Sequence, residues 1–336
     1  MDQRIVERFP GISCAWVDAA GNITTEFYGV ADKESNMLVD EDTIFPACSI
    51  SKFVTAICVM KLHEQCVIDI DAPVNDYLRQ WKLCTPEGRE SNATIRALLC
   101  HTAGTVDGED AFYGLRQNDA EVCLMDILQG NTAYNNRPVR AEKPQGEAFE
   151  YSDAGYCVIQ LMVQEVTGKA FADAAQTLIL DELGMQRTFF ATPEKTAANS
   201  SAMATGYDGE GVPIPGRFPA CPDLAASGLW TTPREMAIIA GAFMEALKGG
   251  NNSLLQAESA WEMTRPVENF PWTGLGVFVD GKDMLMSQGW GEHGQCMMKM
   301  NRCTGEISVV MTNRNPEMDQ AESGVERLVN RHFGKQ

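Results

Sequence analysis

The sequence predicts an α/β fold in which strands from both ends of the chain form one sheet and helices fill the middle. Strand-like segments lie at residues 12–17 and 23–28 near the start, and at residues 284–288, 296–300 and 307–312 near the end. The segments between them are predominantly helical. A chain that begins and ends in strands places both ends in a single sheet, with the helical part packed on it as an insertion.

The 336 residues suffice for one large domain or two closely packed ones, and we find no internal repeat, low-complexity tract or linker. We therefore interpret residues 1–336 as one domain. Its sheet region would be formed by about residues 1–75 and 255–336, and its helical region by about residues 76–254.

The first strands form a hairpin. Residues 12–17 and 23–28 are rich in apolar, β-branched and aromatic side chains, and the intervening Asp18-Ala19-Ala20-Gly21-Asn22 is typical of a turn. Near the other end, residues 273–279 have the same character as the three later strands, and residues 327–333 are expected to form a closing helix.

Capping signals mark the helices of the middle part. Thr94 is an N-cap for the helix that follows it, and residues 153–166 and 171–183 are helical stretches that each run into a glycine. Thr232, followed by proline and then by Glu235, forms a capping box that predicts a helix to about residue 247.

Ser49 and Lys52 are the pair that carries the predicted chemistry. If the segment from Ser49 onward is helical, residues three apart share one face, and the ammonium reaches the hydroxyl. A serine on the first turn also has a free backbone N–H and a dipole that favour an oxyanion. The residues that follow form an apolar stretch typical of a buried helix: Phe53, Val54, Ile57, Val59, Met60 and Leu62. The pattern predicts a serine acyl-enzyme site that needs no histidine.

Tyr151 is a candidate proton relay, because it precedes the helix that begins at Asp153. A phenol can serve as a base if a neighbouring cation lowers its pKa. The alternative is that Tyr151 simply packs against the start of that helix. Further on, residues 290–296 join two strands, and a backbone N–H beyond the glycine at position 294 could complete an oxyanion hole.

Other chemistries lack their signatures. No G-x-S-x-G or H-E-x-x-H occurs, and Gly249-Gly250 lacks the strand–loop–helix context of a phosphate site, so we predict no metal and no cofactor. Structural roles are expected for the remaining histidines, which are His63, His101 and His332.

Charge and cysteine content bear on partners and compartment. The formal net charge of −19 is expected to repel nucleic acid and anionic membrane surfaces. No secretory signal or apolar run of membrane-spanning length is visible, and the 11 cysteines are scattered without C-x-x-C pairs. Reduced thiols and a cytoplasmic location are therefore expected. Cys48 adjoins Ser49, although it can also be explained as a small apolar core residue.

The chain resembles the serine β-lactamase and penicillin-binding-protein family. The resemblance rests on Ser49 with Lys52, on the stretches at residues 98–104, 151–156 and 183–185, and on the strand beginning at His293-Gly294, all in that order. It is greatest for the class C-related branch, with its DD-peptidases, D-aminopeptidases, family VIII carboxylesterases and acyltransferases. It implies an α/β/α sandwich around a central antiparallel sheet beside an all-helical region, with the active site between them.

The resemblance also implies roles for residues. Ser49 would be the nucleophile, Lys52 and Tyr151 the proton-handling pair, and the His293 strand the substrate wall. In the second motif, Asp153 replaces the usual asparagine, and an ionised carboxylate cannot donate a hydrogen bond to a substrate carbonyl.

The third motif also departs from the family pattern. It reads either His293-Gly294-Gln295 or, one residue earlier, Glu292-His293-Gly294, without a cation followed by the usual small pair. The anchor for a β-lactam carboxylate is weakened, so weak or no β-lactamase activity is expected.

These observations predict a serine hydrolase that acylates Ser49 from a small ester or amide. The N–H of Ser49, together with that of Gln295 or Cys296, would bind the oxyanion. An acyltransferase with the same intermediate and a D-aminopeptidase or DD-peptidase-like enzyme are alternatives, and a binding module that has lost turnover is a rival of another class. Substrate identity and oligomeric state are not determined by the sequence.

Overall fold

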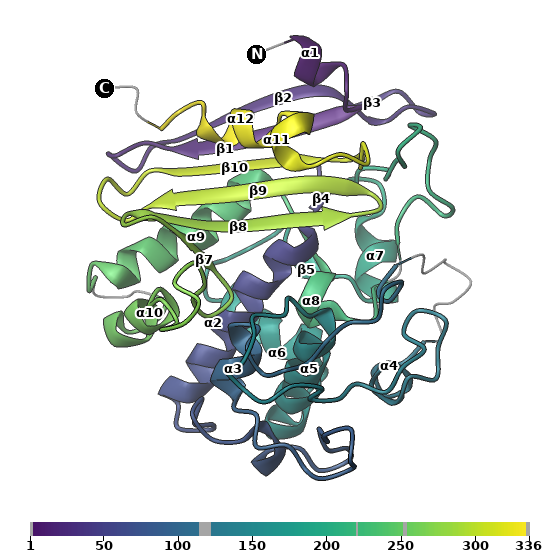
Figure 1. Cartoon of the computed structure of the whole chain (residues 1–336). Helices are drawn as coiled ribbons and strands as arrows, with labels where there is room; N and C mark the ends of the chain where they lie inside the picture. Colours follow the sequence, from purple (N-terminus) through teal and green to yellow (C-terminus); the bar gives the residue numbers. More distant parts are fainter. Residues whose placement is uncertain (1–2, 114–121, 220, 251–253, 334–336) are drawn as a thin grey trace.

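The computed structural model describes residues 3–113, 122–219, 221–250 and 254–333. A seven-stranded antiparallel sheet forms one side of the molecule (Figure 1). In order across the sheet its strands are β3 (Met37–Leu38), β2 (Ile23–Asp32), β1 (Gly11–Val17), β10 (Ile307–Thr312), β9 (Gly294–Asn301), β8 (Met284–Gly291) and β7 (Phe278–Asp280). Because β1 pairs with β10, the two ends of the chain share one sheet, as the sequence predicts.

Helices cover both faces of this sheet, which confirms the α/β/α sandwich (Figure 1). Alternate side chains of a strand point to opposite faces. Cys14 and Val310 accordingly pack in a core on the α12 face, whereas Ala15 and Val309 pack in the larger core on the α9 face. The covering helices are α1 (Gln3–Val6), α11 (Gln320–Ser323) and α12 (Val325–Asn330) on one face, and α9 (Pro233–Leu247) with α10 (Ala257–Met263) on the other.

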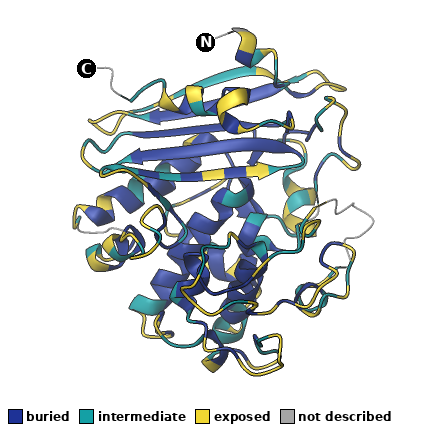
Figure 2. Cartoon of the chain, viewed as in Figure 1, coloured by how far each residue is buried: buried dark blue, intermediate teal, exposed yellow. Residues whose placement is uncertain are grey.

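The helical part is built around α2 (Ser51–Glu64), whose residues 51–62 are all buried (Figure 2). This confirms the buried helix predicted from its apolar sequence. Around it lie η2 (Val74–Asp76), α3 (Ile95–Leu99), α4 (Leu124–Gln129), α5 (Asp153–Thr167), α6 (Phe171–Ala175), α7 (Pro193–Asn199), α8 (Leu224–Ser227) and a small sheet of β4 (Phe45–Pro46), β6 (Leu229–Thr231) and β5 (Phe189–Phe190).

Two predicted elements differ in the structure. Residues 273–277 form a loop instead of a strand, because Gly276 has a φ of +67° and packs where a Cβ would lie 2.5 Å from the Ala56 side chain. Within predicted helix 171–183, only α6 is α-helical, and a π-helical turn, Gln176–Leu180, follows it.

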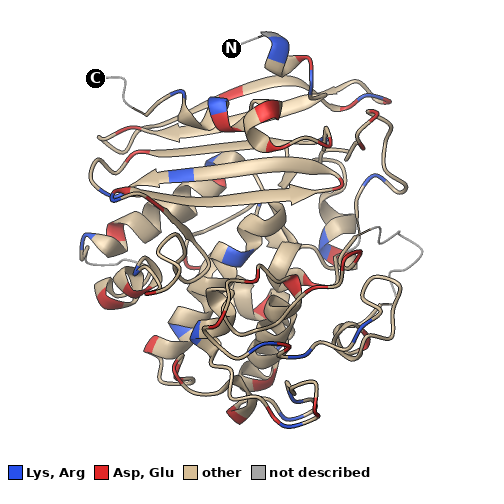
Figure 3. Ribbon diagram, viewed as in Figure 1, with Lys and Arg blue, Asp and Glu red and all other residues tan. Residues whose placement is uncertain are grey.

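The capping box at Thr232 is only half formed. Thr232 accepts a hydrogen bond from the Glu235 N–H, but the Glu235 carboxylate accepts bonds from Arg187 N–H and the Thr188 hydroxyl instead. Asp and Glu residues are spread over both the sheet part and the helical part (Figure 3). Within the described residues, no helix has the length and apolar character that crossing a membrane requires.

Candidate active site

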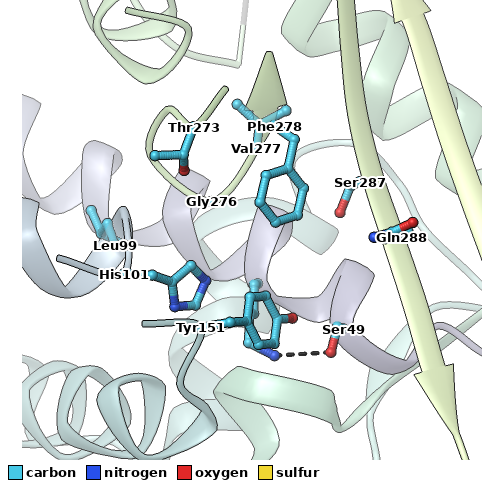
Figure 4. Close-up of a pocket in the computed structure, with 11 residues that line it drawn as sticks. Ser49, Leu99, His101, Tyr151, Thr273, Gly276, Val277, Phe278, Ser287 and Gln288 are labelled. Carbon is cyan, nitrogen blue, oxygen red and sulfur yellow. Dashed lines mark hydrogen bonds between the residues drawn. The ribbon is translucent and has the colours of Figure 1, made fainter. Parts of the chain in front are cut away.

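Ser49 lies in a 3₁₀ turn, Cys48–Ile50, that leads directly into α2. Lys52 follows on the first turn of α2 and is only 3% exposed. Its Nζ donates hydrogen bonds to Ser49 Oγ and to the Ala226 carbonyl oxygen, both at 3.0 Å (the first is dashed in Figure 4). The structure therefore brings the hydroxyl and the amine together in the way that their spacing predicts.

Asp153, the first residue of α5, forms an ion pair with Lys52, with 2.5 Å between Oδ1 and Nζ. Burial on its own lowers the pKa of Lys52, but the Asp153 carboxylate and the Tyr151 phenol outweigh it, so the net shift of that pKa is upward. Lys52 is accordingly an ammonium at neutral pH.

Tyr151 lies against both groups. Its ring centroid is 4.8 Å from Lys52 Nζ, and Figure 4 shows its hydroxyl turned toward Ser49. Tyr151 as a whole is 41% exposed, but the loss of water around its phenol is the strongest effect and raises its pKa. Lys52 lowers this pKa, Asp153 raises it and the hydrogen bond with Ser49 lowers it, and the pKa that results is raised. The anticipated lowering of the pKa by a neighbouring cation is therefore present but is outweighed.

His101 positions the loop that carries Tyr151. The two rings stack with centroids 4.3 Å apart, and His101 Nδ1 accepts a hydrogen bond from the Ser152 N–H. Burial and the Lys52 charge hold the pKa of His101 well below its usual value, so the ring is neutral. Its backbone φ of +61° is uncommon outside glycine. A positioning role fits the structural role expected from the sequence.

Asp107 is a site residue that the sequence did not reveal. Its carboxylate accepts hydrogen bonds from the Ser152 hydroxyl at 2.7 Å, the Asp153 N–H at 2.7 Å and the Ala154 N–H at 3.1 Å. It thereby holds the start of α5, from which Asp153 reaches Lys52. Burial, and then the charge of Asp153, raise the pKa of Asp107 to about 6.

β9, the strand that begins in the third motif, does not have the position predicted for it. β9 has β8 on one side and β10 on the other, so its backbone lies inside the sheet rather than beside Ser49. The Gln295 N–H donates to Thr312 Oγ1 at 3.0 Å, and a Cβ at Gly294 would lie 2.4 Å from the Thr312 carbonyl oxygen. Cys296 turns its thiol to the Ala47 carbonyl oxygen. The predicted oxyanion donors, Gln295 and Cys296, and the predicted β9 wall were therefore wrong.

His293 lies in the turn between β8 and β9 and does not line the cleft beside Ser49. Its ring stacks on Trp230 with centroids 6.0 Å apart, and Nε2 is 3.9 Å from Cys48 Sγ. Gly289 of β8 instead approaches the nucleophile, since a Cβ there would lie 2.5 Å from the Ala47 carbonyl oxygen and 2.8 Å from Cys48 Cβ. A glycine directly after the predicted strand of residues 284–288 was the available signal for this close approach.

A cleft of about 270 Å³ opens beside Ser49 (Figure 4). Its far side is formed by the loop before β7 and by Phe278, the first residue of β7, whose ring stacks on that of Tyr151 with centroids 6.4 Å apart. β8 supplies the opposite side. The lining residues are Ser49, Lys52, Leu99, His101, Tyr151, Thr273, Gly276, Val277, Phe278, Ser287 and Gln288.

A second cleft, of about 530 Å³, lies near Cys48, Asp153, Trp290, Glu292 and His293. Among the described residues that line the two clefts, Lys52 is the only lysine or arginine, and Asp153 neutralises it. In the described part of the chain, no group of three or more His, Cys, Asp or Glu side chains is placed to hold a metal.

Comparison with known proteins decides the family. Residues 2–330 match the family model described as Beta-lactamase. The chain belongs to the beta-lactamase family. This membership, with the serine and lysine in contact, supports its assignment as a serine hydrolase.

Among curated proteins, the chain is 28% identical to the unguisins hydrolase ungD of Aspergillus violaceofuscus over 60% of its own length and 35% of that protein's. It is also 28% identical to the esterase EstB of Burkholderia gladioli over 56% of its own length and 50% of the esterase's. The chain thus matches about a third to a half of the length of these relatives. In fold it resembles the D-amino acid amidase of Ochrobactrum anthropi, with a TM-score of 0.79, 20% identity, and 98% and 95% of the two chains covered.

Proposed function

We propose that the chain is a serine hydrolase that forms an acyl-enzyme on Ser49 from a small ester or amide. The observation that carries the proposal is the contact of Ser49 with the Lys52 ammonium and the Tyr151 phenol at the side of one cleft. A nucleophile with a proton-handling partner within hydrogen-bond reach is the arrangement that acyl transfer requires.

The proton chemistry follows from the charges. Lys52, paired with Asp153, remains an ammonium, so the base is Tyr151 in its phenolate form, which the Lys52 charge stabilises. The phenolate takes the Ser49 proton as Oγ attacks the carbonyl carbon, and the phenol then returns it to the leaving group. Water attacks the acyl-enzyme by the reverse route.

The oxyanion would be held by two backbone N–H groups. One is that of Ser49, at the start of the helical segment. β7 pairs only with residues 284–286 of β8, which leaves the rest of that edge open. The Gly289 N–H faces the Cys296 thiol, and because successive N–H groups alternate between edges, the Trp290 N–H faces the open edge. We assign the second donor to Trp290.

The charges of the clefts restrict the substrate. With Lys52 neutralised by Asp153, the described lining offers no free cation to anchor a carboxylate, so weak or no β-lactamase activity is expected. A neutral ester fits the first cleft, in keeping with the esterase among the relatives. A second candidate is the amide of an amino acid with a free ammonium, because the Glu292 carboxylate lines the second cleft.

Intact-mass measurement after exposure to a fluorophosphonate or a short p-nitrophenyl ester tests the proposal. An adduct is expected on the wild type and not on Ser49→Ala. No adduct on the folded wild type would support the rival, a binding module without turnover. Rates on p-nitrophenyl esters, D- and L-amino acid amides and nitrocefin would rank the substrates, and p-nitrophenol release that speeds up with added alcohols would indicate acyl transfer.

A further inference from the structure

Cys48, the residue before Ser49, lines the second cleft, whereas Tyr151 lines the first. The Cys48 backbone has a φ of +45°, a conformation that costs free energy for a residue with a side chain and is concentrated at functional sites. Two side chains of the sheet approach its thiol, His293 from the β8–β9 turn and Cys296 from β9.

Gly289 leaves room for the two thiols to meet. The position that its missing Cβ would occupy is 2.4 Å from Cys296 Sγ and 2.8 Å from Cys48 Cβ. Cys296 Sγ also lies 2.9 Å from the carbonyl oxygen of Ala47, the residue before Cys48. Both side chains therefore border the space beside Gly289, and the Cys296 sulfur lies against the turn that carries Cys48.

The surroundings shift the pKa values of the two thiols in opposite directions. The neighbouring Cys296 thiol, opposed by burial and assisted by His293 and Lys52, lowers the pKa of Cys48. Burial and then the neighbouring Cys48 thiol raise the pKa of Cys296 well above its usual value. Cys48 therefore ionises more readily than Cys296 and is the more nucleophilic of the two, as in thiol pairs that react with oxidants.

His293 adds an independent indication of a site. It is only 5% exposed, lines the same cleft, and its Nδ1 has no hydrogen-bond partner among the described residues. The other ring nitrogen is the one that faces Cys48 Sγ, at 3.9 Å. By contrast, Cys58 of α2 is buried among apolar side chains, and burial raises its pKa to about 12. Cys48 packs in the same core, but unlike Cys58 it also lines the second cleft.

We propose that Cys48 and Cys296 form an oxidisable dithiol site for hydroperoxides beside the catalytic serine. The Cys48 thiolate attacks the terminal peroxide oxygen, the O–O bond breaks, and the leaving alkoxide or hydroxide takes up a proton, which leaves a sulfenic acid on Cys48. The Cys296 sulfur then attacks the sulfenic sulfur, the S–O bond breaks, and water leaves. The two thiols supply the two electrons that reduce the peroxide.

Oxidation is expected to slow acylation of Ser49. A bond between Cys48 and Cys296 would tie the turn that carries the Ser49 N–H to β9, and a displacement of about 1 Å in a catalytic group can cost a hundredfold in rate. Labelling of Ser49 by a fluorophosphonate should therefore fall at least tenfold on oxidation and recover with dithiothreitol.

The site is tested in the wild-type protein by peptide mapping after hydrogen peroxide, which does not depend on the proposed hydrolase activity. Trypsin cleavage yields residues 34–52 and 283–299, each with one cysteine, Cys48 and Cys296 respectively. The expected product is a disulfide between these two peptides that dithiothreitol reverses. The proposal is overturned if Cys48 stays reduced, is over-oxidised alone, or is joined to Cys221, which lines the same cleft.

Two variants sharpen the result. In Cys296→Ser the reaction should stop at the sulfenic acid, so dimedone should label the peptide of residues 34–52 in this variant and not in the wild type. In the matched control Cys58→Ala the disulfide should form as in the wild type. Equal dimedone labelling of the wild type and Cys296→Ser would exclude Cys296 as the resolving thiol, and the wild-type mapping decides the question if the variant does not fold.

Discussion

At the scale of single residues, the most consequential side chain is Asp153. It converts a lysine at the head of a buried helix into one half of an ion pair, and it opposes the lowering of the Tyr151 pKa by that lysine. An asparagine there could donate a hydrogen bond to a substrate, whereas the carboxylate places a negative charge next to the proton-handling groups. The pH dependence of acylation should therefore differ from that of an enzyme with the usual asparagine.

Asp153→Asn is expected to move the rising limb of the pH–rate profile to lower pH. Asp153 raises the pKa of both Lys52 and Tyr151, so removing its charge lowers both pKa values. The catalytic base is then deprotonated at lower pH. The wild-type rate should still be rising above neutral pH, because the pKa of Tyr151 is raised. The measurement is kcat/KM against pH with a p-nitrophenyl ester. Glu147→Gln, an exposed carboxylate change in the preceding loop, is the control, and superimposable profiles for wild type and Asp153→Asn would contradict the assignment.

Tyr151→Phe tests the phenol directly. The ring packing against His101 and Phe278 can be kept while the proton relay is lost. General acid–base groups contribute about 10² to 10⁴ in rate, so kcat should fall by about that factor with a smaller change in KM. A variant that keeps the wild-type rate would transfer the base role to Lys52.

At the scale of elements, the site depends on how closely β8 approaches the turn before α2. Gly289 is the residue that permits it, since a side chain would press on Ala47 and Cys48. His101 and Asp107 position α5 and its preceding loop from the other direction. The catalytic groups thus come from three elements, and each element has a packing contact that sets its distance from Ser49.

Gly289→Ala should reduce the rate of Ser49 labelling by about a hundredfold, since the shifted turn misplaces the Ser49 N–H. Thermal unfolding checks that the fold persists. Gly241→Ala is the matched control, because it lies in α9 with only Ile307 Cδ1 within 4 Å, at 3.9 Å. Because alanine is favoured over glycine inside a helix, Gly241→Ala should stabilise the protein by up to about 1 kcal/mol and leave the labelling of Ser49 unchanged. Labelling of Gly289→Ala at the wild-type rate would show that Ser49 does not depend on the close approach of β8.

At the scale of the whole molecule, buried acids gather around the single ammonium of Lys52. Asp223 is fully buried; its Oδ1 accepts a hydrogen bond from the Tyr134 hydroxyl, and Oδ2 has no partner among the described residues. Burial and then the Asp153 charge raise the pKa of Asp223 to about 6. Between its unfolded value of 3.8 and about 6, the folded chain holds a proton that the unfolded chain has lost.

Stability contributed by Asp223 is therefore present below about pH 4 and is lost as the pH rises through about 6. Asparagine has no proton that titrates in this range, so the stability of Asp223→Asn does not fall in the same way. Relative to the wild type, its free energy of unfolding should therefore rise by up to about 3 kcal/mol across this range. Urea unfolding at several pH values measures it. In the control Asp18→Asn the trend should be the opposite, because hydrogen bonds from Asn22 lower the pKa of Asp18. Parallel curves for wild type and Asp223→Asn would contradict the prediction.

The sequence by itself determined the features that depend on neighbours along the chain. The Ser49–Lys52 contact follows from helical spacing, the hairpin of β1 and β2 from its alternating strands and turn, and α9 from the Thr232 cap. The pairing of β1 with β10 follows from the order of strands and helices, because a sheet formed from both ends of the chain needs such a pair.

The tertiary structure alone decided the features that join distant residues. It assigned the approach to Ser49 to β8 instead of β9, because the close contact of Gly289 with Ala47 arises between segments far apart in the chain. The raised pKa of Tyr151 has the same origin, since burial and the charge of Asp153 act only after folding. Local spacing determines which groups can react, whereas packing determines what surrounds them and so how they titrate.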